Sequence, residues 1–185
     1  MMRTVSGALV ATALIAVAAV GVRGDDEKTT FQIRATMIGD NEVPPIATDA
    51  KARFHATVDT KAQTITFELT YSGLEGGNTT QSHIHFAPPR VNGGVMVWFC
   101  DSVTKPPMPP KAQPCPTGGQ GTITGTITGA DVQNLAAQGI TGGAGEFDDV
   151  VTAIRKGLSY ANLHTGSFPG GEIRGLVEVR EDEDR

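Results

Sequence analysis

The sequence predicts an all-β protein, built as an antiparallel Greek-key β-sandwich or barrel. Three observations lead to this prediction. The chain of 185 residues holds 23 glycines and 11 prolines and is only 19% charged, a composition typical of turn-rich β structure. Apolar and polar residues alternate with a period of two along several segments, so each segment would bury one face. About eight such segments follow one another at near-regular spacing, with turn residues between them.

The first three predicted strands cover residues 31–37, 52–58 and 65–71. In each of them apolar side chains occupy every second position and polar side chains the positions between, as in a half-buried strand. Glycine, proline, asparagine and aspartate fill the intervals, and these residues favour turns.

Five further strands are predicted at residues 81–87, 94–100, 120–128, 158–165 and 172–180. The segment from Val95 to Cys100 is apolar on both faces, which favours a central strand of the sandwich.

Two short helices are predicted in the loops, at residues 130–138 and 146–156. The second has apolar residues along one face and acidic residues in its first turn. It ends at Arg155-Lys156-Gly157, an order that suits the helix dipole and a glycine C-cap.

Residues 1–24 are predicted to be a secretory signal peptide. Met1-Met2-Arg3 forms a short positive start, an apolar run from Val5 to Val22 follows, and Ala16-Val17-Ala18 offers a cleavage site, with cleavage nearer Asp25 as the alternative. The competing interpretation is an uncleaved membrane anchor. The alanine and glycine content of the run makes it weakly hydrophobic, which favours cleavage.

The rest of the chain is predicted to be one β domain at residues 31–180, preceded by a linker at 25–30 and followed by an acidic tail at 181–185. Removing residues 1–24 takes away two arginines and no acid, which lowers the net charge from −5 to −7. This charge argues against nucleic acid as a partner. Because no second apolar run of spanning length follows, the processed chain is expected to have no membrane span and to be secreted or periplasmic.

Cys100 and Cys115 are the only cysteines. In an oxidising compartment they are predicted to form a disulfide that closes a proline-rich loop. The alternative is a pair of metal thiolates, which would need further ligands nearby.

Three of the four histidines suggest a metal site. His83 and His85 are two apart in a predicted strand, so both project to one face while Ile84 points into the core. If the strand that carries His164 lies alongside, three imidazoles would converge, a ligand set that suits zinc or copper. The alternative is that these histidines are hydrogen-bonded scaffold. His55 falls on the polar face of its strand and is predicted to be a surface residue.

Four motifs stand in a fixed order along the chain: Glu42-Val43-Pro44-Pro45, His83-Ile84-His85, Asn162-Leu163-His164-Thr165 and Gly171-Glu172-Ile173-Arg174-Gly175. This ordered set resembles the CHRD domain, the module named after chordin and widespread in exported bacterial proteins. The resemblance spans about residues 31–179. It implies an all-β domain of this length and no known enzymatic activity. The recurrent family positions then fall on His83, His85, Asn162, His164, Thr165, Glu172 and Arg174. We expect Asn162 and Glu172 to orient the imidazoles.

A second similarity concerns copper/zinc superoxide dismutase, a sandwich with a His-x-His pair of copper ligands, a nearby arginine and a disulfide. Four histidines cannot supply its full two-metal ligand set. For the fold itself, we expect a sandwich that is immunoglobulin-like or superoxide-dismutase-like. The leading hypothesis is an exported, non-enzymatic binding or structural module for an unknown extracellular protein or surface ligand, with a His-lined zinc or copper site. The alternative is a copper-dependent redox enzyme in which Arg174 is the charged group near the metal.

Overall fold

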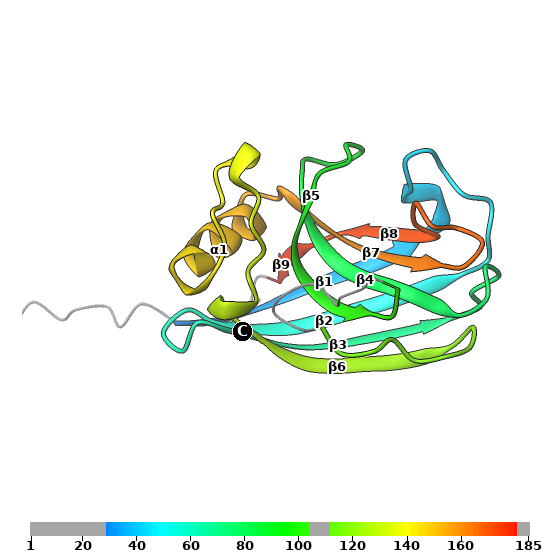
Figure 1. Cartoon of the computed structure of the whole chain (residues 1–185), viewed down its shortest axis with the longest axis horizontal. Coiled ribbons are helices and arrows are strands. Elements are labelled where there is room, and N and C mark those ends of the chain that lie inside the picture. The colour runs from blue at the N-terminus through cyan, green and yellow to red at the C-terminus, as the bar shows by residue number, and fades with distance from the viewer. Residues whose placement is uncertain (1–28, 104–111, 181–185) are drawn as a thin grey trace, which may run out of the picture.

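The computed structural model describes residues 29–103 and 112–180 (Figure 1). The predicted signal peptide, most of the predicted linker, the acidic tail and four of the prolines in the disulfide loop lie outside the described residues. Thr30, which we expected in the linker, is already the first residue of a strand.

The described residues form nine strands, and every pairing between them is antiparallel. The strands are β1 (Thr30–Ile38), β2 (Lys51–Asp59), β3 (Thr64–Ser72), β4 (Thr79–Phe86), β5 (Gly94–Asp101), β6 (Gly121–Thr128), β7 (Ser159–Thr165), β8 (Ile173–Leu176) and β9 (Glu178–Arg180).

The strand order is β5-β4-β7-β8-β1-β2-β3-β6, with β9 paired to β1 beyond the end of β8. The sheet curls so that it nearly closes into a barrel (Figure 1). Phe99 of β5 contacts Phe54 of β2 and Phe67 of β3, with ring centroids 4.9 and 4.6 Å apart. The half of the sheet made of β5, β4, β7 and β8 therefore shares one core with the half made of β1, β2, β3 and β6. The predicted all-β antiparallel fold is confirmed.

The prediction that residues 94–100 form a central strand is wrong, because β5 stands at one end of the strand order. The edge of β5 that has no neighbouring strand in the described residues is paired with residues that follow β5 in the chain. The amide of Asp101 donates to the Gln113 carbonyl, and the Gln113 side chain donates to the carbonyls of Phe99 in β5 and Thr124 in β6. These bonds join β5 to β6 and form a seam between the two ends of the strand order. The predicted disulfide between Cys100 and Cys115 lies at this seam. Residues on both faces of β5 are buried, among them Met96, Val97 and Phe99, although β5 ends the strand order.

The predicted helix at 146–156 is present as α1 (Phe147–Arg155). The predicted helix at 130–138 is wrong. Two single 3₁₀ turns stand there instead, η2 (Gly129–Asp131) and η3 (Ala136–Gln138). Between them the amide of Gln133 donates to the Met96 carbonyl of β5, so tertiary pairing replaces the helical bonds. Two further 3₁₀ turns are η1 (Gly39–Asn41) and η4 (Ala144–Glu146).

The predicted strand at 172–180 is divided at Val177 into β8 and β9. The amide of Val177 donates to the Ser159 carbonyl at the start of β7, while β9 turns to β1. In residues 29–103 and 112–180, no helix has the length and apolar character needed to cross a bilayer.

Candidate metal centre

The outer face of β4, β5, β7 and β8 carries a buried row of polar and aromatic side chains. The register sets His83 of β4 opposite Asn162 of β7 on one side and Trp98 of β5 on the other. One step along, His85 lies opposite Tyr160. Ile84, between the two histidines, is fully buried in the core, as the alternation predicted.

The three histidines meet on this face. The ring centroid of His83 lies 4.4 Å from that of His85 and 4.7 Å from that of His164. One ring nitrogen from each of the three lies within 4.8 Å of the others. The strand pairing of β4 with β7 thus produces the convergence that the His-x-His spacing and His164 predicted.

Two of the rings are held in a defined tautomer by main-chain carbonyls. Nδ1 of His85 lies 2.8 Å from the Gly93 oxygen, and Nδ1 of His164 lies 2.9 Å from the Pro169 oxygen. A carbonyl oxygen only accepts, so each Nδ1 carries the hydrogen and donates it. In the neutral ring the lone pair is then on Nε2, the atom free to bind a metal.

The nitrogens left over have no partner of their own. Nε2 of His85, Nε2 of His164 and Nδ1 of His83 are buried and make no hydrogen bond in the described part of the chain. An unsatisfied buried polar atom costs about 1–3 kcal/mol, and buried polar groups are nearly always bonded. One ring nitrogen from each histidine lies within 4.8 Å of the others, an arrangement that a bound cation would satisfy.

Burial favours the neutral form of all three imidazole rings. Burial lowers the pKa of His85 to about 4, against the opposing effect of its bond to Gly93. Burial also lowers the pKa of His83 well below its ordinary value, helped by the two neighbouring histidines, and it lowers the pKa of His164. Neutral imidazole is the form that ligates metals.

Aromatic rings enclose the cluster. Trp98 meets the edge of His83 at 4.6 Å between centroids, and Tyr160 stacks on His85 at 4.5 Å. The Arg174 guanidinium lies over the Tyr160 ring at 4.0 Å. Sequence reasoning did not assign Trp98 to the site. Trp98 lies directly opposite His83 in the neighbouring strand, and the sequence does not show that register.

Glu42, Asn162 and Arg174 form a buried network beside the histidines. The Glu42 carboxylate accepts from Arg174 Nε at 3.1 Å and from the Asn162 amide. Arg174 also donates to the Asn92 side chain at 2.6 Å. Burial raises the pKa of Glu42, and the Arg174 charge opposes that rise. The first motif of the sequence therefore supplies the counterion of the fourth.

Glu172 serves a different purpose from the one we expected. The buried Glu172 carboxylate accepts from the Thr165 hydroxyl at 2.6 Å, from Thr48, and from the amides of Glu75 and Gly76. These partners are hydroxyl and main-chain groups and not imidazoles. Glu172 ties two loops to the end of β7 and does not orient a histidine. His55 is exposed on β2, as predicted.

The fold and this face define the class of the protein: an antiparallel β domain with a buried, histidine-lined site on one outer face. Comparison with family models matches residues 33–177 to the CHRD domain, and the chain belongs to this family. The resemblance drawn from the four motifs is confirmed. CHRD domains are extracellular, and the disulfide fits an oxidising compartment. Comparison with curated proteins gives no match.

Proposed function

We propose that this protein is an exported CHRD module, secreted or periplasmic, that holds one zinc or copper ion at His83, His85 and His164. The ion would bind a donor group of an extracellular protein or surface ligand. The observation that carries the proposal is the set of three buried ring nitrogens without hydrogen-bond partners in the described residues. Histidines that served only as scaffold would be expected to bond those nitrogens.

The donor set fits such an ion. Three imidazoles are a common ligand set for zinc and suit copper equally. Zinc–nitrogen bonds of about 2.0–2.1 Å place ligand atoms closer together than 4.8 Å, so a bound ion would draw the rings inward. The carbonyls of Gly93 and Pro169 would support two of the rings from behind, as outer partners do in metal sites.

Three protein ligands leave one coordination position for water or a ligand atom. Among the described residues the group contains no carboxylate, because Glu42 is committed to Arg174 and Asn162. The open position is what would let the module bind something through the ion rather than use it only for stability.

Untagged protein should retain about one zinc or copper ion per chain after loading and dialysis, measured by elemental analysis. Calorimetric titration of His164→Gln should show at least about a tenfold weaker affinity, since one of three ligands is lost. Zinc should also raise the melting temperature of the wild type and not that of this variant.

His55→Gln is the matched control, because His55 is the exposed fourth histidine. It should bind metal like the wild type. A wild-type protein that retains no ion, or equal losses in His55→Gln and His164→Gln, would contradict the proposal.

A copper-dependent redox enzyme is the second candidate. It is favoured by one observation: the Arg174 guanidinium lies over the Tyr160 ring, which stacks on His85, so a fixed positive charge stands beside the imidazoles. Copper-loaded protein should then consume superoxide faster than the same amount of free copper, and Arg174→Gln should slow it. A rate equal to that of free copper would remove this candidate.

A further inference from the structure

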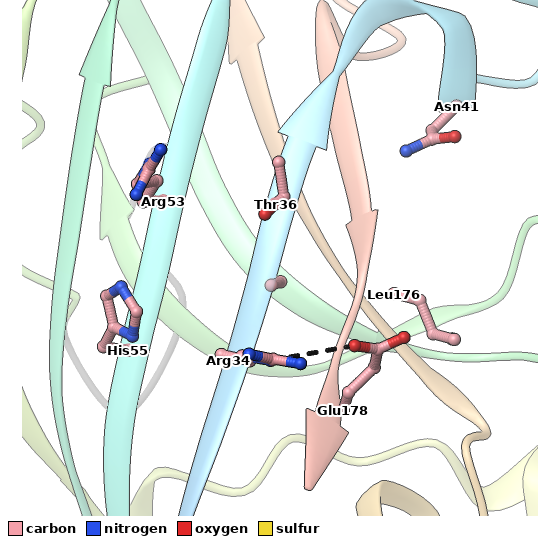
Figure 2. Close-up of a pocket in the computed structure, with 8 residues that line it drawn as sticks. Arg34, Thr36, Asn41, Arg53, His55, Leu176 and Glu178 are labelled. Carbon is pink, nitrogen blue, oxygen red and sulfur yellow. Dashed lines mark ion pairs between the residues drawn. The ribbon is translucent and has the colours of Figure 1, made fainter. Parts of the chain in front are cut away.

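We propose that the protein has a second binding site, for the oxyanion group of an acidic saccharide, in an open pocket of about 470 Å³ over β1 and β2 (Figure 2). The pocket shares no residue with the histidine cluster, so this proposal stands apart from the metal function.

The strand register builds the pocket floor. Arg34 of β1 lies opposite His55 of β2, and Thr36 lies opposite Arg53. Directly opposed side chains have Cβ atoms about 4.5–5.5 Å apart, so these four side chains start from neighbouring positions on one face of the sheet. Figure 2 shows these side chains together on the two neighbouring strands.

Two carboxylates lie near the patch: Glu178 lines the pocket, and Glu68 lies opposite His55 on β3. Arg34 reaches Glu178 of β9 at 3.9 Å, a long pair in which both side chains are more than half exposed, and such pairs are weak. The Arg53 side chain makes no ion pair or hydrogen bond among residues 29–103 and 112–180. The two arginines and Glu178 give the described pocket lining a net charge of +1, on a chain whose net charge is −5. Guanidinium forks match the oxygens of carboxylate, sulfate and phosphate groups.

The rest of the lining favours a hydroxyl-rich ligand over a peptide. Thr36 and Asn41 offer a hydroxyl and an amide, and among the described residues Leu176 is the one large apolar side chain that lines the pocket. Asn41 and Leu176 also line a smaller neighbouring pocket, which contains Arg90 and Arg174. The groove thus continues across β8 to Arg90, while Arg174 is already paired with Glu42, and its length suits an extended acidic saccharide better than a free ion.

The test is titration of the full chain with an oligogalacturonate, a sulfated oligosaccharide, a neutral oligosaccharide and inorganic phosphate, at low and high salt. An acidic saccharide should bind, the neutral one should not, and high salt should weaken the binding. Arg53→Gln should weaken it at least fivefold. Glu178→Gln should strengthen it, because the competing carboxylate is removed.

Lys61→Gln is the charge-matched control, since Lys61 is exposed in the turn after β2 and outside the pocket. It should change the affinity less than twofold. Equal losses in Lys61→Gln and Arg53→Gln would show attraction by general charge and overturn the proposal. So would the absence of binding to either acidic saccharide, or phosphate binding as tight as theirs.

Discussion

The outer faces of the two halves of the sheet carry similar residues in very different surroundings. On β1 and β2, alternation places Arg34 and His55 in solvent. On β4 and β7, the same alternation places His83 and His164 on the outer face, yet both are buried. The loops make the difference on the face of β4 and β7. The Gly93 carbonyl bonds His85 there, and the Pro169 carbonyl bonds His164. Alternation predicts the face of a side chain, whereas loops decide whether that face is solvated.

Two arginine–glutamate pairs show this contrast, since one pair is buried and the other is exposed. Arg174 and Glu42 lie 3.1 Å apart with 6% and 2% of their side chains exposed, and Arg34 and Glu178 lie 3.9 Å apart with 57% and 56% exposed. Glu42→Gln should lower the free energy of unfolding by about 3–5 kcal/mol, because it leaves the Arg174 charge buried without its counterion. Denaturant unfolding measures the change.

Glu178→Gln is the control for that comparison. Its effect on the free energy of unfolding should be at most about 1 kcal/mol, because exposed pairs are screened by water. Similar effects of the two substitutions would mean that the loops do not isolate the histidine face from solvent.

The seam between the two halves gives the next largest effect. Cys100 ends the half that holds the histidines, and Cys115 precedes β6 of the other half. Replacing both by serine should lower the free energy of unfolding by about 3 kcal/mol, as expected for a loop closed by residues 15 apart. Reductant should lower the stability of the wild type equally and leave the double variant unchanged. A double variant as stable as the oxidised protein would show that Gln113 and its neighbours hold the seam without the bond.

A neighbouring pair of glycines gives the smallest effect and tests how tightly the loops close. Gly171 has a φ of +120°, and an added Cβ would lie 2.6 Å from polar atoms of Asn162 and Glu42. Gly171→Ala should lower the free energy of unfolding by about 1–3 kcal/mol. Gly170→Ala should be nearly neutral, because nothing lies within 4 Å of its added Cβ. Thermal unfolding distinguishes the two, and equal melting temperatures would mean that the loop yields easily.

The strands could be predicted from sequence because a strand with one buried face alternates apolar and polar residues. The same rule placed Ile84 in the core and His83 and His85 on one face. It failed for residues 94–100, because β5 is buried like a central strand although it stands at one end of the strand order. It failed for residues 130–138, where a bond between Gln133 and Met96 outweighed local helical preference.

The site was predictable only where side chains carry the signal. The three histidines were found from their spacing and from the family motifs. The carbonyls of Gly93 and Pro169 were not, because every residue has a carbonyl and only the folded loop aims it. Glu172 illustrates the converse: a carboxylate near histidines in sequence bonds two loops instead.

The most direct test of the account is a crystal structure of zinc- or copper-loaded protein, with the ion located by its anomalous scattering. We expect one strong peak about 2.0–2.2 Å from nitrogens of His83, His85 and His164, with Nδ1 of the last two still bonded to Gly93 and Pro169. A fully loaded crystal whose only peak lies elsewhere, for instance at exposed His55, would contradict it.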